Sequence, residues 1–285
     1  MSDQHGGDGS AATGLAGLLA ARFQDGAGLD ASVAVPAHLA MASHCAHRAW
    51  TDRPLPLETL RTLCAIALSA PTKSDMQSRD IVIVDEPQRR ATLAALIGPD
   101  PWIAQAPGLL VFCGNQRRQR LLHEWRGHAF ANDHLDWFFN AAVDAAIAMQ
   151  AFVAAAEAAG LGCCPLSTVR NRAAEVSDFL ELPAHVFPVA AMAVGWPARG
   201  NRITPRLPLS TTVHVDRHRE QGLREAVDAY DRWRDERQPY VRQRAESRLG
   251  RAAFYGWSED KARQYSVPDR ADFGAFVRAR GFRLD

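Results

Sequence analysis

Three separated segments of the chain carry cationic side chains beside small or turn-forming residues. The first holds His44, His47 and Arg48, the second runs from Pro71 to Gln77, and the third is Thr-Pro-Arg-Leu-Pro at residues 204–208. A phosphate group is bound by Arg or His donors together with hydroxyls, and a flavin ring takes amide-type partners along its pyrimidine edge. The three segments together contain both kinds of group.

Taken singly, these residues have plainer interpretations. His44 and His47 lie three positions apart and are also typical of residues that cap or flank a helix. Arg206 between two prolines fits a solvated loop, and Gln77 fits a surface position before a charged strand edge. A function is therefore inferred only from the segments together.

A fourth stretch, Ala158 to Asn171, predicts a close approach of the backbone to a ligand. An Ala-rich helix ends at Gly160 and Gly162, a short apolar run follows, and a small-residue turn over 165–168 leads to the next helix. Such a segment brings bare backbone N–H groups close to whatever lies above a sheet. Together with the basic segments, it points to a bound flavin.

Bulk composition narrows the class of protein. The chain has 285 residues, 47% of them hydrophobic and 23% charged, with a net charge of +1, which is typical of a soluble globular protein and not of a nucleic-acid binder. The longest apolar stretches are short or carry charges, and the N-terminus lacks the basic region of a signal peptide. We therefore expect a cytoplasmic protein with neither nucleic-acid nor membrane partners.

The cysteines and histidines do not form a disulfide or metal pattern. Five cysteines at irregular spacing are a poor disulfide framework and fit a reducing cytoplasm. Cys163-Cys164 is compatible with a redox pair, but adjacent strand residues point to opposite faces, which favours two packed thiols. His123 and His128 lack a third ligand at a suitable spacing, so no metal site is predicted.

Hydrophobic periodicity predicts strands that alternate with helices, a layered α/β arrangement. Residues 1–11 have the composition of a disordered segment. Asp144 lies inside an otherwise apolar helix and needs a partner, and a structural hydrogen bond to a loop is favoured over catalysis. The expected strands are 81–84, 109–113, 161–166 and 187–196, and the expected helices are 12–23, 36–43, 57–69, 87–97, 134–159 and 173–182.

In this order the segments resemble the FMN-dependent nitroreductase family, especially its larger, NADPH-preferring, flavin-reductase-like branch. That branch shows His-Arg-Ser-x-Arg, a Ser-rich turn ending in Gln, Ala-Ala-Glu-x-x-Gly-Leu-Gly, Arg-Asn, Lys-Pro-Arg-Leu-Pro and a downstream His. The resemblance covers roughly residues 40–215. The matching stretches are His44-Cys45-Ala46-His47-Arg48, Ser74-Asp75-Met76-Gln77, residues 155–162, Arg170-Asn171, residues 204–208 and His214.

The resemblance implies the fold class and the domain organisation. The expected fold is α+β, a three-layer α/β/α sandwich with a central mixed sheet and a C-terminal arm that wraps the partner of a homodimer. Residues 1–35 are expected to be a flexible N-terminal extension and residues 36–215 the FMN-binding core. Residues 216–285 are expected to form a helical arm that makes dimer and substrate contacts.

The resemblance also implies a cofactor site for FMN, with NADPH or NADH as co-substrate. His44, Arg48 and Arg206 would hold the flavin phosphate, and Gln77 would bond to the ring edge. The turn Pro165-Leu166-Ser167-Thr168 would lie against the isoalloxazine and offer a backbone N–H near N5. Because flavin N5 carries the hydride, no side chain is assigned a catalytic role.

This chain departs from the family pattern within that site. Cys45 and Ala46 belong to the phosphate-binding segment but stand where the family has Arg and Ser, and Thr204 replaces Lys. In the turn, Pro165 replaces an aromatic residue and Ser167-Thr168 replaces a Gly-Gly pair. The candidates for compensating the lost cations are Lys73, His47 and Arg202.

The expected function is transfer of two electrons from NAD(P)H to a small-molecule acceptor, a nitroaromatic, a quinone or another conjugated compound. Two alternatives remain: a flavin-dependent oxidase or dehydrogenase for a dedicated metabolite, and a flavin-binding protein without turnover. The charged run 217–251 is typical of a solvated helix. Alternatively, some of its arginines meet the extra phosphate of NADPH, the candidates being Arg234, Arg237, Arg242 and Arg244.

Overall fold

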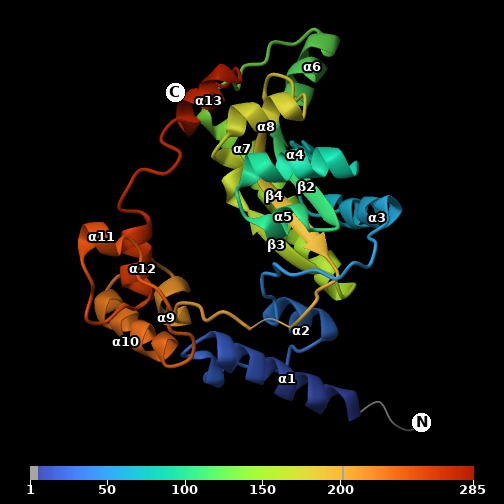
Figure 1. The fold of residues 1–285 in the computed structure, drawn as a ribbon. Coiled ribbons are helices and arrows are strands. Elements are labelled where there is room, and N and C mark those ends of the chain that lie inside the picture. Colours follow the sequence, from blue (N-terminus) through green and yellow to red (C-terminus); the bar gives the residue numbers. More distant parts are fainter. Residues whose placement is uncertain (1–5, 201) are drawn as a thin grey trace. The chain divides into compact units, whose positions relative to one another are not determined.

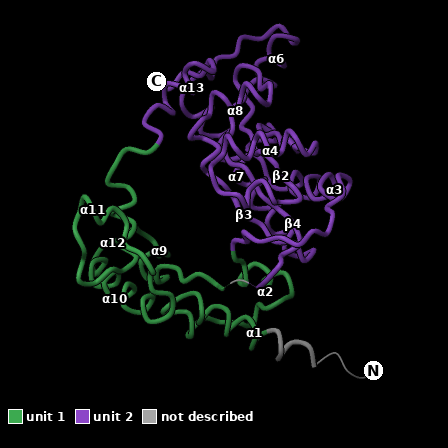
Figure 2. The backbone as a smooth tube through the Cα atoms, in the orientation of Figure 1, with its two compact units in different colours: residues 1–45, 202–269 green, residues 46–201, 270–285 purple. Residues whose placement is uncertain are grey.

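The structure, a computed structural model, describes residues 6–200 and 202–285 and divides the chain into two compact units (Figure 2). Unit 1 combines the N-terminal residues up to Cys45 with Arg202–Asp269. Unit 2 combines Ala46–Asn201 with Arg270–Asp285. Neither unit is continuous in the sequence, because the N-terminal residues combine with residues 202–269 and the C-terminal residues combine with residues 46–201. The three-segment organisation expected from sequence stays a prediction.

Unit 2 is built on a four-stranded sheet with the order β1-β2-β4-β3. Strands β2, β3 and β4 of this sheet are labelled in Figure 1. Each of the predicted strands is present. All pairings between these strands are antiparallel, where a mixed sheet was expected; a single parallel bridge joins Ala46 to Cys163 at the β3 edge. The strand bounds are β1 Arg79–Ile83, β2 Gly108–Asn115, β3 Gly162–Leu166 and β4 Val186–Gly195.

Helices cover both faces of this sheet, so the expected three-layer sandwich is confirmed. Along β2, Leu109 and Val111 pack into one hydrophobic cluster, and Leu110 and Phe112 pack into the other. This alternation follows from the two-residue period of a strand. The Leu109 face is covered by α4 (Pro87–Ile97) and α8 (Ala173–Phe179), and the other face by α3 (Leu57–Leu68) and α7 (Leu135–Ala158).

The helix α7 is long and apolar enough to cross a membrane by length and composition, but its inner side packs against the sheet. Ala148, Phe152 and Val153 of α7 are buried in the cluster that contains Phe112. The helix is followed by Gly160 at φ +81°, a left-handed conformation that favours glycine. The predicted core helix and its glycine end are therefore confirmed.

The remaining elements of unit 2 are short. The C-terminal residues belong to a cluster in which Phe187 of β4 contacts Val277 and Phe282, so the last part of the predicted C-terminal arm is packed within unit 2. These elements are α5 (Pro101–Ala104), α6 (Arg117–Arg126), α13 (Phe273–Ala279) and the 3₁₀ turns Lys73–Asp75 and Ser167–Arg170.

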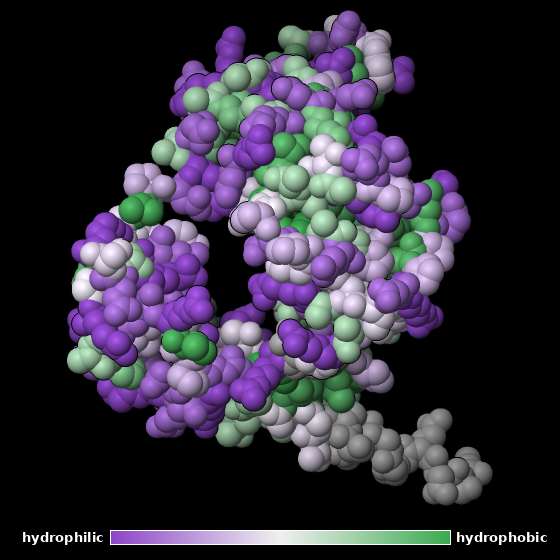
Figure 3. All heavy atoms as spheres, in the orientation of Figure 1, coloured by the Kyte–Doolittle hydropathy of each residue, from purple (hydrophilic) through white to green (hydrophobic). Residues whose placement is uncertain are grey.

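Unit 1 consists of helices whose surface is mostly hydrophilic over α10 to α12 (Figure 3). Its interior contains paired polar groups: buried Asp231 accepts a hydrogen bond from the backbone N–H of Ser258 at 2.9 Å. Residues 6–11, predicted to be disordered, instead begin α1, while residues 1–5 lie outside the described residues. Its elements are α1 (Gly6–Arg22), the 3₁₀ turn Gly26–Gly28, α2 (Pro36–Ala42), α9 (Leu209–Thr212), α10 (Leu223–Asp235), α11 (Glu246–Leu249) and α12 (Trp257–Gln264).

Candidate cofactor-binding site

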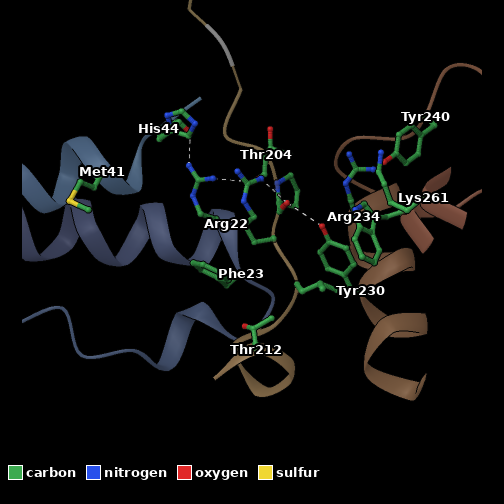
Figure 4. Close-up of a pocket in the computed structure, with 14 residues that line it drawn as sticks. Arg22, Phe23, Met41, His44, Thr204, Thr212, Tyr230, Arg234, Tyr240 and Lys261 are labelled. Carbon is green, nitrogen blue, oxygen red and sulfur yellow. Dashed lines mark hydrogen bonds between the residues drawn. The ribbon is translucent and has the colours of Figure 1, made fainter. Parts of the chain in front are cut away.

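Unit 1 contains a cavity of about 670 Å³ whose wall is rich in cations (Figure 4). His44 and Arg206, two of the predicted phosphate-binding residues, both line it. Cationic side chains that converge on a concave surface favour an anionic ligand. The other lining residues are Arg22, Phe23, Met41, Thr204, Pro205, Leu207, Thr212, Tyr230, Arg234, Tyr240, Trp257 and Lys261.

The loop that carries Arg206 is fixed by its backbone. The N–H of Arg206 donates to the carbonyl of Arg22 at 2.7 Å, and Phe23 forms a parallel bridge with Arg206. The hydroxyl of buried Tyr230 donates to the carbonyl of Pro205 at 3.1 Å. The backbone is therefore held from both α1 and α10, while the Arg206 side chain is exposed.

In unit 2, the segment with Ala46 and Arg48 runs beside β3. The N–H of His47 donates to the carbonyl of Cys163 at 2.9 Å, next to the Ala46–Cys163 bridge. A Cβ on Gly162 would lie 2.6 Å from Cγ of His47, so this close approach requires glycine. Arg48 is exposed, with its guanidinium 5.6 Å from the Trp102 ring.

The adjacent thiols of Cys163 and Cys164 are structural. Burial raises the pKa of both thiols, although Arg48 nearby opposes the shift at Cys164. None of the five cysteines is joined in a disulfide in the part of the chain that the structure describes. A raised pKa disfavours the thiolate that redox and metal chemistry need, so the interpretation as two packed thiols holds. Within residues 6–200 and 202–285, no group of three metal-ligating side chains comes together.

The turn predicted to face a flavin ring follows β3 directly. Pro165 is exposed and Leu166 is buried at the strand end, and Ser167 and Thr168 begin the 3₁₀ turn. The Thr168 Oγ1 is buried and has no hydrogen-bond partner among the described residues. Arg270 donates to the Ser167 carbonyl at 3.1 Å. A buried hydroxyl without a protein partner is satisfied by an ordered water or by a ligand atom.

Gln77 belongs to a turn that is organised by Asp144 of α7. The Asp144 carboxylate accepts hydrogen bonds from the Thr72 hydroxyl and from the backbone N–H groups of Lys73 and Ser78. The N–H of Gln77 in turn donates to the Thr72 hydroxyl at 2.9 Å. Gln77 is exposed at φ +53°, and its side-chain amide donates to the Asp75 carboxylate at 3.2 Å. The predicted structural role of Asp144 is confirmed.

The predicted site residues are thus divided between the units. Unit 1 holds His44, Cys45 and Arg206, with His44 and Arg206 on one cavity wall. In unit 2, Ala46 and Arg48 lie beside β3, and β3 leads into the 165–168 turn. Gln77 lies in a separate turn beside α7.

Sequence reasoning missed several cavity residues, among them Arg22, Tyr230 and Lys261, and left Arg234 among several candidates. Arg22 ends an Ala- and Leu-rich helix, and Tyr230 lies in a charged helix, so neither had a motif around it. Of the arginines considered for NADPH, Arg234 lines the cavity. Arg244 is paired with Asp260 at 3.1 Å, and Arg237 stacks on Trp233.

Comparison with protein families identifies two matching models. Residues 41–196 match the model of the nitroreductase family, and residues 204–285 match the model of its C-terminal domain. Together these matches reach into both units, and the part of unit 1 before residue 41 lies outside them.

Comparison with individual proteins agrees with the family match. The chain is 30% identical over 250 residues to the FMN reductase [NAD(P)H] of Bacillus subtilis, covering 86% of this chain and 97% of that protein. It is 28% identical over 244 residues to the NADPH-flavin oxidoreductase of Vibrio harveyi, covering 84% and 95%. Among solved structures, Bacillus megaterium NfrA2 superposes with a TM-score of 0.79 at 28% identity, covering 87% and 98%. The chain belongs to the nitroreductase family.

Proposed function

We propose that the protein is an FMN-dependent oxidoreductase that takes two electrons from NAD(P)H and passes them to a small conjugated acceptor such as a nitroaromatic or a quinone. The observation that carries the proposal is the cavity with His44 and Arg206 on its wall. Relatives named for FMN reduction and NADPH-flavin oxidoreduction support it.

The residues present fit FMN. The cavity supplies cations for a phosphate, and the orphaned Thr168 hydroxyl leaves one buried polar atom for a ligand beside the 165–168 turn. When bound, FMN would supply hydride chemistry at its N5. His44, Arg48 and Arg206 would bind the phosphate by charge-assisted hydrogen bonds. Gln77 would donate its side-chain amide to the ring edge.

In this proposal no side chain of the protein has to act as a general acid or base. The backbone of the 165–168 turn would orient the ring and offer an N–H donor. Nearby cations would stabilise the negative charge of the reduced ring. Neither Cys163 nor Cys164 is assigned a role, because burial raises the pKa of both thiols.

The assembly proposed for this chain is a homodimer. Supporting it, α7 exposes Leu135, Phe139 and Val143, whose spacing of four residues places them on one side of the helix. An exposed apolar stripe on a helix is typical of a protein–protein contact. The proposed location is the cytoplasm, which the odd number and irregular spacing of the five cysteines support.

An absorbance spectrum of the purified protein, recorded before and after anaerobic NADPH, tests the function. A flavin band that bleaches with NADPH is the expected result. A flavin band that stays oxidised would contradict reductase activity and favour a dedicated oxidase or a flavin carrier. Absence of a flavin band even after addition of FMN would contradict the cofactor assignment.

A further inference from the structure

Arg22, the last residue of α1, is an almost fully buried cation with only 7% of its surface exposed. Its Nε and Nη2 donate to the carbonyl of Ala42 at 3.1 and 2.8 Å, and Nη2 also donates to the carbonyl of His44 at 2.6 Å. Its Nη1 donates to the carbonyl of Thr204 at 3.2 Å. One guanidinium therefore joins two segments that are far apart in the sequence.

These two segments are the ones that carry the predicted phosphate-binding residues of the cavity. Figure 4 shows Arg22 between His44 and Thr204, with its hydrogen bonds to these two residues drawn. The main chain of Arg22 reinforces the link, because its carbonyl accepts the N–H of Arg206. Side chain and backbone of a single residue thus set the spacing between His44 and Arg206.

The chemistry of the link suits a cation. Ala42 is the last residue of α2, and carbonyls at a helix C-terminus lack intrahelical donors and carry partial negative charge. A guanidinium satisfies several such carbonyls at once, which the single nitrogen of a lysine cannot do in the same geometry. Arg22 also adds positive charge to the cavity wall.

That charge lies close to two positions at which this chain lacks the basic residue of the family pattern. Cys45 replaces Arg and Thr204 replaces Lys. Arg22 donates to the carbonyl of His44, the neighbour of Cys45, and to the carbonyl of Thr204. Arg22 precedes residue 41, at which the match to the family model begins. Its contribution therefore belongs to the part of this chain outside both family matches.

We propose that Arg22 is a positioning residue for phosphate binding: it holds the Ala42–His44 and Thr204–Arg206 backbones at the spacing that presents His44 and Arg206 to the flavin phosphate. This inference rests on the proposed function. The N-terminal segment is then part of the cofactor site, in contrast to the flexible extension expected from its sequence.

The test compares two ligands that differ only in the phosphate. Apo protein is titrated with FMN and with riboflavin, and the dissociation constants are measured by quenching of flavin fluorescence. The variants are Arg22→Met and Arg22→Lys, with Arg224→Met as the matched control, since Arg224 is 84% exposed on α10 and pairs with Asp228. The unfolding midpoint of each apo variant is measured in parallel.

Arg22→Met is expected to weaken FMN at least about tenfold, a change equivalent to ~1.4 kcal/mol, while riboflavin affinity stays within about twofold. Arg22→Lys should lie between wild type and Arg22→Met, and Arg224→Met should match wild type. Equal losses for both flavins would overturn the proposal, because they would indicate a general structural role. Unchanged FMN affinity would overturn it as well.

Failure of the proposed function and failure of the Arg22 proposal give different results. If the wild-type protein binds no FMN, the proposed function fails before any variant is compared. If Arg22→Met does not fold, Arg22→Lys decides, and a wild-type ratio of FMN to riboflavin affinity in that variant overturns the proposal.

Discussion

The hydroxyl of Thr72 donates a hydrogen bond of 2.5 Å to the carboxylate of Asp144, which is 1% exposed in the middle of α7. The same hydroxyl accepts the N–H of Gln77. A polar residue in an apolar core helix thereby fixes the turn that carries a predicted flavin contact.

Replacement of Asp144 by alanine is expected to be strongly destabilising. It would remove the acceptor of the Thr72 hydroxyl and of two backbone N–H groups, and unsatisfied buried donors cost about 1–3 kcal/mol each. We expect the free energy of unfolding in urea to fall by about 3 kcal/mol. Asp144→Asn keeps one acceptor oxygen and should lose less; equal stability of wild type and Asp144→Ala would contradict this role.

Arg206→Ala is expected to weaken FMN binding. The side chain lines the cavity, and charge-assisted hydrogen bonds contribute about 1.5–3 kcal/mol each. The FMN dissociation constant should therefore rise roughly ten- to a hundredfold in fluorescence titration. Arg217→Ala, at an exposed position of the same unit, serves as the control. If Arg206→Ala binds FMN as tightly as wild type, the phosphate is held elsewhere.

Arg234 is the arginine that we expect to distinguish NADPH from NADH. It lines the cavity, its Nε is buried without a hydrogen-bond partner among the described residues, and its guanidinium lies 4.4 Å from the Tyr240 ring. Arg234→Gln should raise KM for NADPH about tenfold and leave KM for NADH unchanged. Arg237→Gln, which alters a residue stacked on Trp233, is the control. A parallel rise for both nucleotides would argue against phosphate recognition.

Cys64 on α3 should make stability depend on pH in the alkaline range. Burial raises the pKa of its thiol from 9.0 to about 11. The folded state therefore keeps the proton at a pH where the unfolded chain releases it, so this stabilisation is complete below pH 9 and is lost as pH rises towards 11. The full shift corresponds to about 2–3 kcal/mol, and partial contact of the thiol with solvent reduces the loss below that value.

The measurement is urea unfolding of wild type and Cys64→Ala between pH 8 and pH 11. The difference in stability between the two proteins should shrink across this range. A difference that stays constant would show that the thiol titrates alike in both states.

Phe139→Glu should dissociate the proposed homodimer. Phe139 is 60% exposed on the apolar stripe of α7, and a buried unpaired carboxylate in an interface is costly. Light scattering during gel filtration should give a dimer for wild type and for Leu122→Glu, which alters an exposed residue of α6, and a monomer for Phe139→Glu. A dimeric Phe139→Glu protein would place the contact on another surface.

The sequence predicted the secondary structure of unit 2 better than its strand directions. Runs such as Ile81–Ile83 and Leu109–Cys113 stand out because helices cover both faces of the sheet. Strands buried on both faces read as continuous apolar runs, which are typical of parallel sheets, and nothing in such a run encodes direction. The antiparallel pairings therefore required the structure.

Some residues of the candidate site were predicted from the sequence, and others were found only in the structure. His44 and Arg206 were found from residue types in a recognisable order, and Asp144 was predicted to need a loop partner. Arg22 was missed because its partners are backbone carbonyls, which every residue has and no motif marks. The orphaned Thr168 hydroxyl was also invisible, since it depends on packing around the turn.

The contacts of Arg22 with Thr204 and Arg206 also determine when unit 1 can finish folding during synthesis. Residues 46–201 of unit 2 emerge from the ribosome as one continuous stretch, so most of the sheet core can form early. Arg22 can contact Ala42 and His44 soon after translation begins. Its hydrogen bond with Arg206 can form only after residue 206 has been synthesised. The cavity wall closes only when α10 and α12 follow. Nascent chains should therefore acquire flavin late, when translation is almost finished.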